Sequence, residues 1–60
     1  TKNPDIYNNI GVIYNELRQY DRAIEEFLRA IYLNPTYAKP YNNIDVVYYA
    51  KKDFPGAIRN

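Results

Sequence analysis

The segment YNNIGVIY, residues 7–14, returns as YNNIDVVY at residues 41–48, after a shift of 34 positions. The same shift lays residues 1–26 over residues 35–60 without a gap and also pairs Ala23 with Ala57 and Ile24 with Ile58. A sequence period of this length is typical of folds in which one small structural unit is duplicated. We therefore expect a single repeat segment over residues 1–60, with a first unit at residues 4–37 and a second, truncated unit at residues 38–60.

The composition argues against several classes of function. The 60 residues include no cysteine or histidine, so disulfides, the usual zinc ligand sets and Ser/His or Cys/His catalytic pairs are absent. Eight basic and seven acidic side chains are mixed along the chain, without the basic stripe typical of nucleic-acid binding. No apolar run approaches the roughly 20 residues that span a bilayer, and the amino terminus does not resemble a signal peptide. We expect a soluble chain without metal or cofactor, in a reducing or neutral compartment such as the cytoplasm.

The first unit has the pattern of two antiparallel helices. Asn3 can cap a helix, Pro4 suits its first position and Asp5 complements the positive helix end, which predicts a helix over residues 4–17. A second apolar series begins beside Asp21 and stops before Pro35, which predicts a helix over residues 21–33. Apolar residues at helical spacing define one stripe on each helix: Ile6, Tyr7, Ile10, Ile13, Tyr14 and Leu17 on the first, and Tyr20, Ile24, Phe27, Leu28 and Ile31 on the second.

The second unit repeats this pattern until the sequence stops. A third helix is predicted over residues 38–52, with Pro40 in its first turn, where the missing N–H is harmless. A fourth helix can only begin near Pro55. The sequence therefore predicts an all-α fold. The residues that the third helix should turn inward are Tyr41, Ile44, Val47 and Tyr48.

The small and aromatic residues predict how these helices pack. Gly11, Ala23 and Ala30 allow two backbones to approach closely while large side chains interlock around them. The tyrosines could instead form a stacking platform for bases or sugars, but most of them lie on the apolar stripes, which favours core packing. We assign to the core Tyr7, Tyr14, Tyr20, Tyr41 and Tyr48, and leave Tyr32, Tyr37 and Tyr49 outside it.

Asp45 is the conspicuous difference between the two units, because it stands where the first unit has Gly11. A buried, unpaired carboxylate costs several kcal/mol, so close helix packing is not expected there. We predict that the second unit is looser than the first, with Asp45 meeting water, a basic residue such as Lys52 or Arg59, or another chain.

Together these residues resemble the tetratricopeptide repeat, a helix–turn–helix unit with a period of 34 residues. With Pro4 as the first position, every signature position of the first unit holds an acceptable residue: Tyr7, Ile10, Gly11, Tyr14, Ala23, Phe27, Ala30 and Pro35. The second unit supplies Tyr41, Ile44, Tyr48 and Ala57, and departs from the signature at Asp45. The resemblance implies antiparallel helical hairpins stacked in a right-handed α-solenoid that binds protein or peptide partners.

In the resembled family, the first helices of successive units line a groove that binds extended peptides. Helical periodicity gathers Asp5, Asn9, Val12 and Glu16 on one face of the first helix, away from the tyrosines of its apolar stripe. The third helix carries the counterparts of these residues, and the family's groove includes the position of Tyr49. The candidate peptide-binding residues are Asp5, Asn8, Asn9, Val12, Glu16, Lys39, Asn42, Asn43, Val46 and Tyr49.

The paired asparagines need a reason, since asparagine inside a helix costs about half a kcal/mol relative to alanine. One reason is recognition, because Asn9 and Asn43 match the asparagine ladders of some repeat superhelices, which hydrogen-bond a peptide backbone. Another is structural, with the amides bonding a neighbouring helix or water. A carboxylate clamp, as in chaperone-binding repeats, matches at Asn9 and Lys39, but Asn43 stands where the clamp needs arginine.

Catalysis is not expected from this sequence. Asp21, Glu25 and Glu26 could be taken for a metal or acid/base cluster, but acidic residues in the first turn of a helix are expected from the helix dipole. Two function classes remain: peptide recognition in the groove, and a structural role in which repeats stack on one another. Because such a unit buries its core only against neighbours, we expect a piece of a longer array or a homo-oligomer that associates through its exposed ends.

Overall fold

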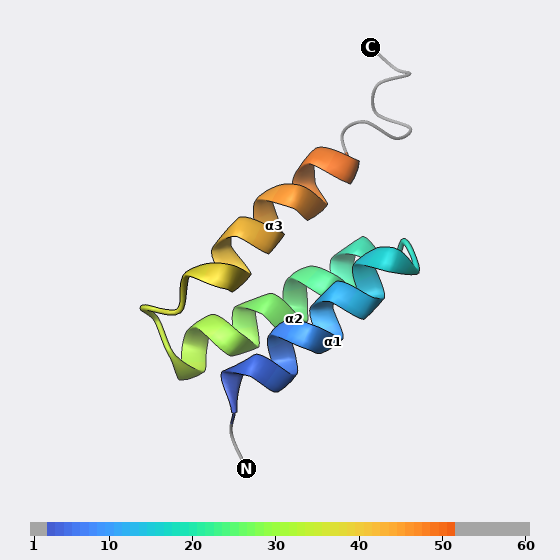
Figure 1. The fold of residues 1–60 in the computed structure, drawn as a ribbon. Helices are drawn as coiled ribbons and strands as arrows, with labels where there is room; N and C mark the ends of the chain where they lie inside the picture. Colours follow the sequence, from blue (N-terminus) through green and yellow to red (C-terminus); the bar gives the residue numbers. More distant parts are fainter. Residues whose placement is uncertain (1–2, 52–60) are drawn as a thin grey trace.

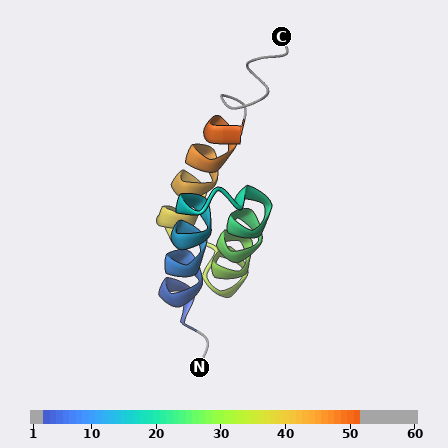
Figure 2. The same ribbon diagram turned by 90° about the vertical axis from the view of Figure 1, so that its right-hand side faces the viewer.

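The computed structural model describes residues 3–51, which form three α-helices joined by short turns (Figure 1). The helices are α1 (Pro4–Glu16), α2 (Tyr20–Leu33) and α3 (Ala38–Lys51). α1 and α2 form an antiparallel hairpin, and α3 runs back along it in the direction of α1 (Figure 2). The all-α prediction is confirmed, and each predicted helix boundary inside the described residues is met to within one residue. The predicted end of the third helix at Lys52 and the predicted start of a fourth at Pro55 lie outside the described residues.

The start of α1 follows the local rules that predicted it. The side-chain Oδ1 of Asn3 accepts a hydrogen bond from the backbone N–H of Asp5 at 2.9 Å, and Pro4 takes the first helical position. A side-chain cap of this kind stabilises a helix by about 1 kcal/mol. Asp5 adds a negative charge at the positive end of the helix dipole.

The turn between α1 and α2 combines the end of α1 with a tight reversal of the chain. Arg18 takes a positive φ of 64°, the left-handed region that glycine usually occupies. Its N–H donates to the carbonyl of Asn15 at 3.0 Å, and the next N–H, that of Gln19, donates to the carbonyl of Tyr14 at 2.9 Å. This pair of bonds is a Schellman motif, which satisfies carbonyl groups at the helix end and reverses the chain.

The turn between α2 and α3 is held by side chains as well as backbone. Asn34 Oδ1 accepts from the N–H of Thr36 at 3.3 Å and from its hydroxyl at 3.0 Å. Tyr41 on α3 donates its hydroxyl to the carbonyl of Pro35 at 3.1 Å. These bonds fix the point at which α3 leaves the hairpin and returns along it.

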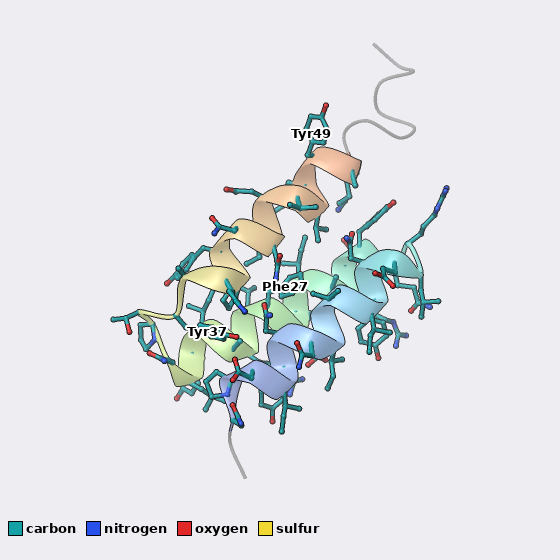
Figure 3. All side chains as sticks on the ribbon, viewed as in Figure 1. Phe27, Tyr37 and Tyr49 are labelled. Carbon is teal, nitrogen blue, oxygen red and sulfur yellow. The ribbon has the colours of Figure 1, made fainter. Side chains whose placement is uncertain are left out.

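The core is small and is centred on Phe27, which projects from α2 between the other helices (Figure 3). Gly11 lies against this ring so closely that a Cβ added to it would be 2.5 Å from a ring carbon. Nothing larger than glycine fits at position 11 unless the ring moves. Val47 of α3 joins Phe27 and Ala23 in the buried cluster. Partly buried side chains pack around this cluster: Val12, Tyr14, Tyr20, Ile24 and Ile44.

The prediction that Tyr41 and Tyr48 belong to the core is wrong for the described part of the chain. They are 46% and 54% exposed, although their counterparts in the first unit, Tyr7 and Tyr14, are half-buried. The first-unit tyrosines lie beside α2. The segment that would follow α3 in the same way begins after residue 51 and lies outside the described residues. Burial of a repeat position therefore depends on the helix beside it.

The single apolar stripe predicted on α1 proves to be two rows. Tyr7, Gly11 and Tyr14 lie on the side that faces α2, where Gly11 meets Phe27. The second row lies about 100° around the helix. It consists of the exposed side chains Ile6, Ile13 and Leu17, together with the half-buried Ile10.

Candidate functional site

One hydrogen bond between side chains links the two helices that carry the candidate residues. Asn43 on α3 donates from Nδ2 to Oδ1 of Asn8 on α1 at 2.9 Å. Asn8 is only 5% exposed, whereas Asn43 is half-buried. The structural alternative that the sequence left open, an amide bonded to a neighbouring helix, therefore describes this pair. α1 and α3 are therefore in direct contact at this pair.

The remaining candidates of α1 form a mixed surface. Asp5, Asn9 and Glu16 are exposed, and Val12 is half-buried because part of it packs against the core cluster. The surface thus offers two carboxylates and an amide around an apolar centre. Of the candidates on this helix, only Asn8 is buried.

The remaining candidates of α3 are all exposed: Lys39, Asn42, Val46 and Tyr49. Val46 is 54% exposed although it is the repeat counterpart of the half-buried Val12. Tyr49 is more exposed still and extends away from the helices near the end of α3 (Figure 3). Lys39 supplies a positive charge to a face whose first helix supplies negative ones.

Tyr37 closes one end of this surface. Its hydroxyl donates a hydrogen bond to the carboxylate of Asp5, which ties the turn before α3 to the first turn of α1. The hydrogen bond to Asp5 raises the pKa of Tyr37 above its usual value, because the proton is shared with a negatively charged acceptor; desolvation and the charge of Asp5 act in the same direction. Asp5 is therefore both a groove candidate and a partner in the contact between the units.

Acidic residues are used in ion pairs on the outside of the helices. Asp21 is exposed at the start of α2. Its Oδ1 accepts a hydrogen bond from Nζ of Lys51 on α3 at 2.9 Å. Glu26 lies 3.9 Å from Arg29 on the same helix. Within residues 3–51, no cluster of three or more acidic, cysteine or histidine side chains is placed to hold a metal ion. None of the helices described for this chain is long and apolar enough to cross a membrane.

Three residues of the site were missed by sequence reasoning. Tyr37 and Lys51 make their contacts across more than 29 sequence positions, and no local pattern identifies such partners. Asn15 has a buried side-chain oxygen that receives no hydrogen bond within the described residues. A signal for Asn15 did exist, because it follows Asn8 by seven positions, or two helical turns, and so shares its side of α1.

The described residues also line two open pockets. One open pocket lies on the outside of the hairpin and is lined by Tyr7, Glu25, Leu28, Arg29, Tyr32 and Leu33. Another lies near the end of α3 and includes Tyr49 beside Asp45, Tyr48 and Lys51. This shallow, open hollow therefore combines two tyrosines with one acidic and one basic side chain.

Comparison with known proteins extends the structural result. The tetratricopeptide repeat family model matches residues 4–37. Over 53 residues, the chain is 36% identical to the tetratricopeptide repeat domain-containing protein PYG7, chloroplastic, of Arabidopsis thaliana. That alignment covers 88% of this chain and 18% of the relative, so the chain spans less than a fifth of the relative's length. No solved structure matches the chain significantly.

The matched region coincides with the features described above. It contains the α1–α2 hairpin, the Gly11–Phe27 contact and the turn that leads into α3. Repeats of this family are non-catalytic modules that generally mediate protein–protein interactions. On its helices, its 34-residue period and the family match, the chain belongs to the tetratricopeptide repeat family.

Proposed function

We propose that the chain binds an extended peptide of a partner protein on the surface formed by α1 and α3. The hydrogen bond from Asn43 to Asn8 is the observation that carries this proposal, because it joins the two helices whose candidate residues would together form one continuous surface. An extended peptide needs such a continuous surface, with apolar contacts for its side chains and polar groups for its backbone.

The chemistry of the surface supports this class of ligand. Val12 and Val46 provide the apolar contacts, and Tyr49 adds an exposed aromatic ring that can serve as an anchor. The amides of Asn9 and Asn42 are exposed, and each offers both a donor and an acceptor to a peptide backbone. Asp5, Glu16 and Lys39 supply charges of both signs at the rim. We propose that Asn8 acts indirectly, by holding Asn43.

Charge favours a peptide that is acidic where it meets Lys39 and basic where it meets Glu16. Asp5 is less free for such a contact, because Tyr37 already donates to it. Rim charges of this kind set orientation and association rate more than affinity. A catalytic role is not part of the proposal.

Panning of a phage-displayed library of random peptides on the immobilised chain tests the proposal. We expect enriched peptides that compete with one another and lose at least about tenfold in affinity when Val46→Asp or Tyr49→Ala is introduced, because each change removes more than about 1.4 kcal/mol of contact. Leu28→Asp is the matched control, since Leu28 is 52% exposed on the opposite side of the hairpin. Enriched peptides that bind Val46→Asp and Tyr49→Ala as tightly as the parent chain would contradict the proposal.

A structural role is the second candidate function, and the exposed row Ile6, Ile13 and Leu17 is the observation that favours it. Ile6 and Ile13 lie three and four positions from the groove candidate Asn9, so this role would use the part of α1 that borders the peptide-binding surface.

A further inference from the structure

The open pocket on the outer side of the α1–α2 hairpin lies apart from the candidate groove residues. Tyr7 of α1 lines one part of it, and five residues of α2 line the rest: Glu25, Leu28, Arg29, Tyr32 and Leu33. We call it the outer pocket. It brings two tyrosines and two leucines together with one acidic and one basic side chain. Tyr32 is 86% exposed, so its ring is accessible to a ligand.

The same hairpin shows how one of its tyrosines holds a cation. The guanidinium of Arg22 on α2 lies over the ring of Tyr14 on α1, 6.0 Å from the ring centroid. A cation at about this distance is attracted by the negative face of an aromatic ring, and arginine makes such contacts more often than lysine. The contact joins the two helices across the seam between them.

The outer pocket lies two helical turns farther along this seam. Tyr7 precedes Tyr14 by seven residues on α1, which places the two rings in one row. On the antiparallel α2, Arg29 follows Arg22 by seven residues and lines the pocket together with Tyr7. Arg29 does not repeat the ring contact. Its Nε instead lies 3.9 Å from Oε1 of Glu26 on its own helix. Within residues 3–51 no cation lies over the ring of Tyr7, so this position of the seam is open.

The charge of the outer pocket favours a cation. Glu25 is exposed, and its carboxylate makes no ion pair or hydrogen bond within the described part of the chain. The opposite charge of Arg29 is already matched by Glu26, whose side chain is only 18% exposed. One negative charge therefore remains beside two aromatic rings. Ring faces and a carboxylate are the groups that together bind an organic cation.

We propose that the outer pocket binds an arginine side chain of a partner protein. The guanidinium lies against the rings of Tyr7 and Tyr32 and pairs with the carboxylate of Glu25. The methylene groups of the arginine pack on Leu28. Arginine suits this pocket better than lysine, because a guanidinium is planar, is less strongly hydrated than an ammonium group, and can stack on a ring while bonding a carboxylate. The pocket shares no residue with the peptide-binding surface, so the two proposals stand independently.

Nuclear magnetic resonance titration of the full, isotope-labelled chain tests the proposal. The probe is the capped pentapeptide Gly-Gly-Arg-Gly-Gly, and its control carries citrulline, which keeps the shape of arginine without the charge. At fixed ionic strength, we expect the arginine peptide to shift the ring signals of Tyr7 and Tyr32 saturably. The citrulline peptide should bind at least about threefold more weakly, because it loses both the ring contact and the ion pair. A lysine peptide should bind with intermediate affinity.

Two pairs of variants locate the bound arginine. Glu25→Gln should weaken binding at least about twofold, whereas Glu16→Gln, which removes an exposed carboxylate from the groove side of α1, should leave it unchanged. Both variants change the net charge equally, so long-range attraction does not account for a difference between them. Tyr32→Leu should weaken binding at least about twofold and Tyr32→Phe should preserve it, since the ring face makes the contact. Because Tyr32 is exposed, neither change is expected to prevent folding.

Four results would overturn the proposal. The first is no saturable shift, or binding of the citrulline or lysine peptide as tightly as the arginine peptide. The second is a loss on Glu16→Gln as large as that on Glu25→Gln, since the arginine would then lie in the groove. The third is equal binding by Tyr32→Leu and Tyr32→Phe. The fourth is sedimentation of the parent chain as a dimer that Glu25→Gln dissociates, because the occupant would then be a second copy. Peptide binding through Val46 and Tyr49 is measured separately and is decided by none of these results.

Discussion

Gly11 and Asp45 occupy the same position in the two units and have opposite surroundings. Gly11 is buried under the ring of Phe27, so that even one added carbon would overlap it. Asp45 is exposed, as the prediction that it meets water requires; the alternative partners Lys52 and Arg59 lie outside the described residues. The same helical pattern therefore yields a closed contact in one unit and an open face in the other. A repeat position acquires its role from the helix packed beside it.

The largest loss of stability is expected when aspartate, the residue of the second unit at position 45, replaces Gly11 of the first unit. Gly11→Asp places a side chain where a Cβ alone would lie 2.5 Å from the Phe27 ring. Overpacking costs about 1–3 kcal/mol, and an uncompensated buried charge costs about 3–5 kcal/mol. Because this sum approaches the whole stability of a small domain, we expect loss of the cooperative thermal transition in far-UV circular dichroism.

The reverse substitution, Asp45→Gly, places the first unit's glycine in the second unit. It changes an exposed helical position and is expected to lower the free energy of unfolding by no more than about 1 kcal/mol, the penalty of glycine inside a helix. Equal melting temperatures for Gly11→Asp and Asp45→Gly would refute the contrast between the closed and open positions.

A second prediction isolates the contact itself. Gly11→Ala should destabilise the chain by about 1–2 kcal/mol. The overlap of the added methyl with Phe27 costs more free energy than the better helix propensity of alanine gains. In a Phe27→Leu background the overlap is relieved, and Gly11→Ala should be neutral or stabilising. Urea denaturation of the four proteins measures the coupling, expected at about 0.5–3 kcal/mol. Additive effects would mean that the ring does not limit position 11.

A third prediction compares Asn9 with Asn43, which occupy one position in the two units. Asn43→Ala leaves the buried amide of Asn8 without its donor and is expected to cost about 1–3 kcal/mol. Asn9→Ala removes an exposed side chain and should stabilise the chain by about half a kcal/mol through helix propensity. Urea denaturation of both variants provides the measurement. A loss on Asn9→Ala as large as that on Asn43→Ala would show that Asn9 already has a partner in the isolated chain.

The parts of the fold that follow from local physics were predictable from the sequence. The Asn3 cap, the proline in the first turn of α1 and the helix end before Pro35 depend on neighbouring residues, so helix boundaries were predicted within one residue. The need for a small residue at position 11 was also expected, because Gly11 lets two helix backbones approach closely while large side chains interlock around it.

What the sequence could not assign was the partner of each side chain across units. Tyr41 carries the same pattern as Tyr7 but lies exposed, since burial depends on a helix that the pattern alone does not place. Asn8 and Asn43 were both candidate groove residues, and no local pattern assigned the hydrogen bond between them or the burial of Asn8. The contact of Tyr37 with Asp5 spans 32 positions and has no local signal. Peptide binding by the ten candidate residues remains a prediction.

A smaller loss of stability is expected at Lys51, the repeat counterpart of Leu17. Lys51 pairs with Asp21 at 2.9 Å, but both side chains are well exposed, so Lys51→Ala should cost only about 0.2–1 kcal/mol at low salt. Added salt screens such a pair, and the cost should vanish near 1 M salt, where the screening length is about 3 Å. Thermal melts of the parent and variant over a salt series test this, with Leu17→Ala as the salt-independent control. A cost that persists at high salt would indicate that Lys51 contributes through packing.

The last prediction is confined to alkaline pH and concerns the positions of Asn3 and Tyr37, which are repeat counterparts. Asn3 caps its own helix, whereas Tyr37 reaches across to Asp5. Because the folded state raises the pKa of Tyr37, the unfolded chain loses this proton first, starting near its ordinary pKa of about 10. The stability that the bond contributes is thus complete below that pH and is lost as pH rises through the folded pKa. The difference in melting temperature between the parent and Tyr37→Phe should therefore be constant below pH about 10 and should narrow as the pH rises above it. Tyr32→Phe, at an exposed tyrosine on α2, should follow the parent throughout, and a constant gap between the parent and Tyr37→Phe would show that the contact with Asp5 does not titrate.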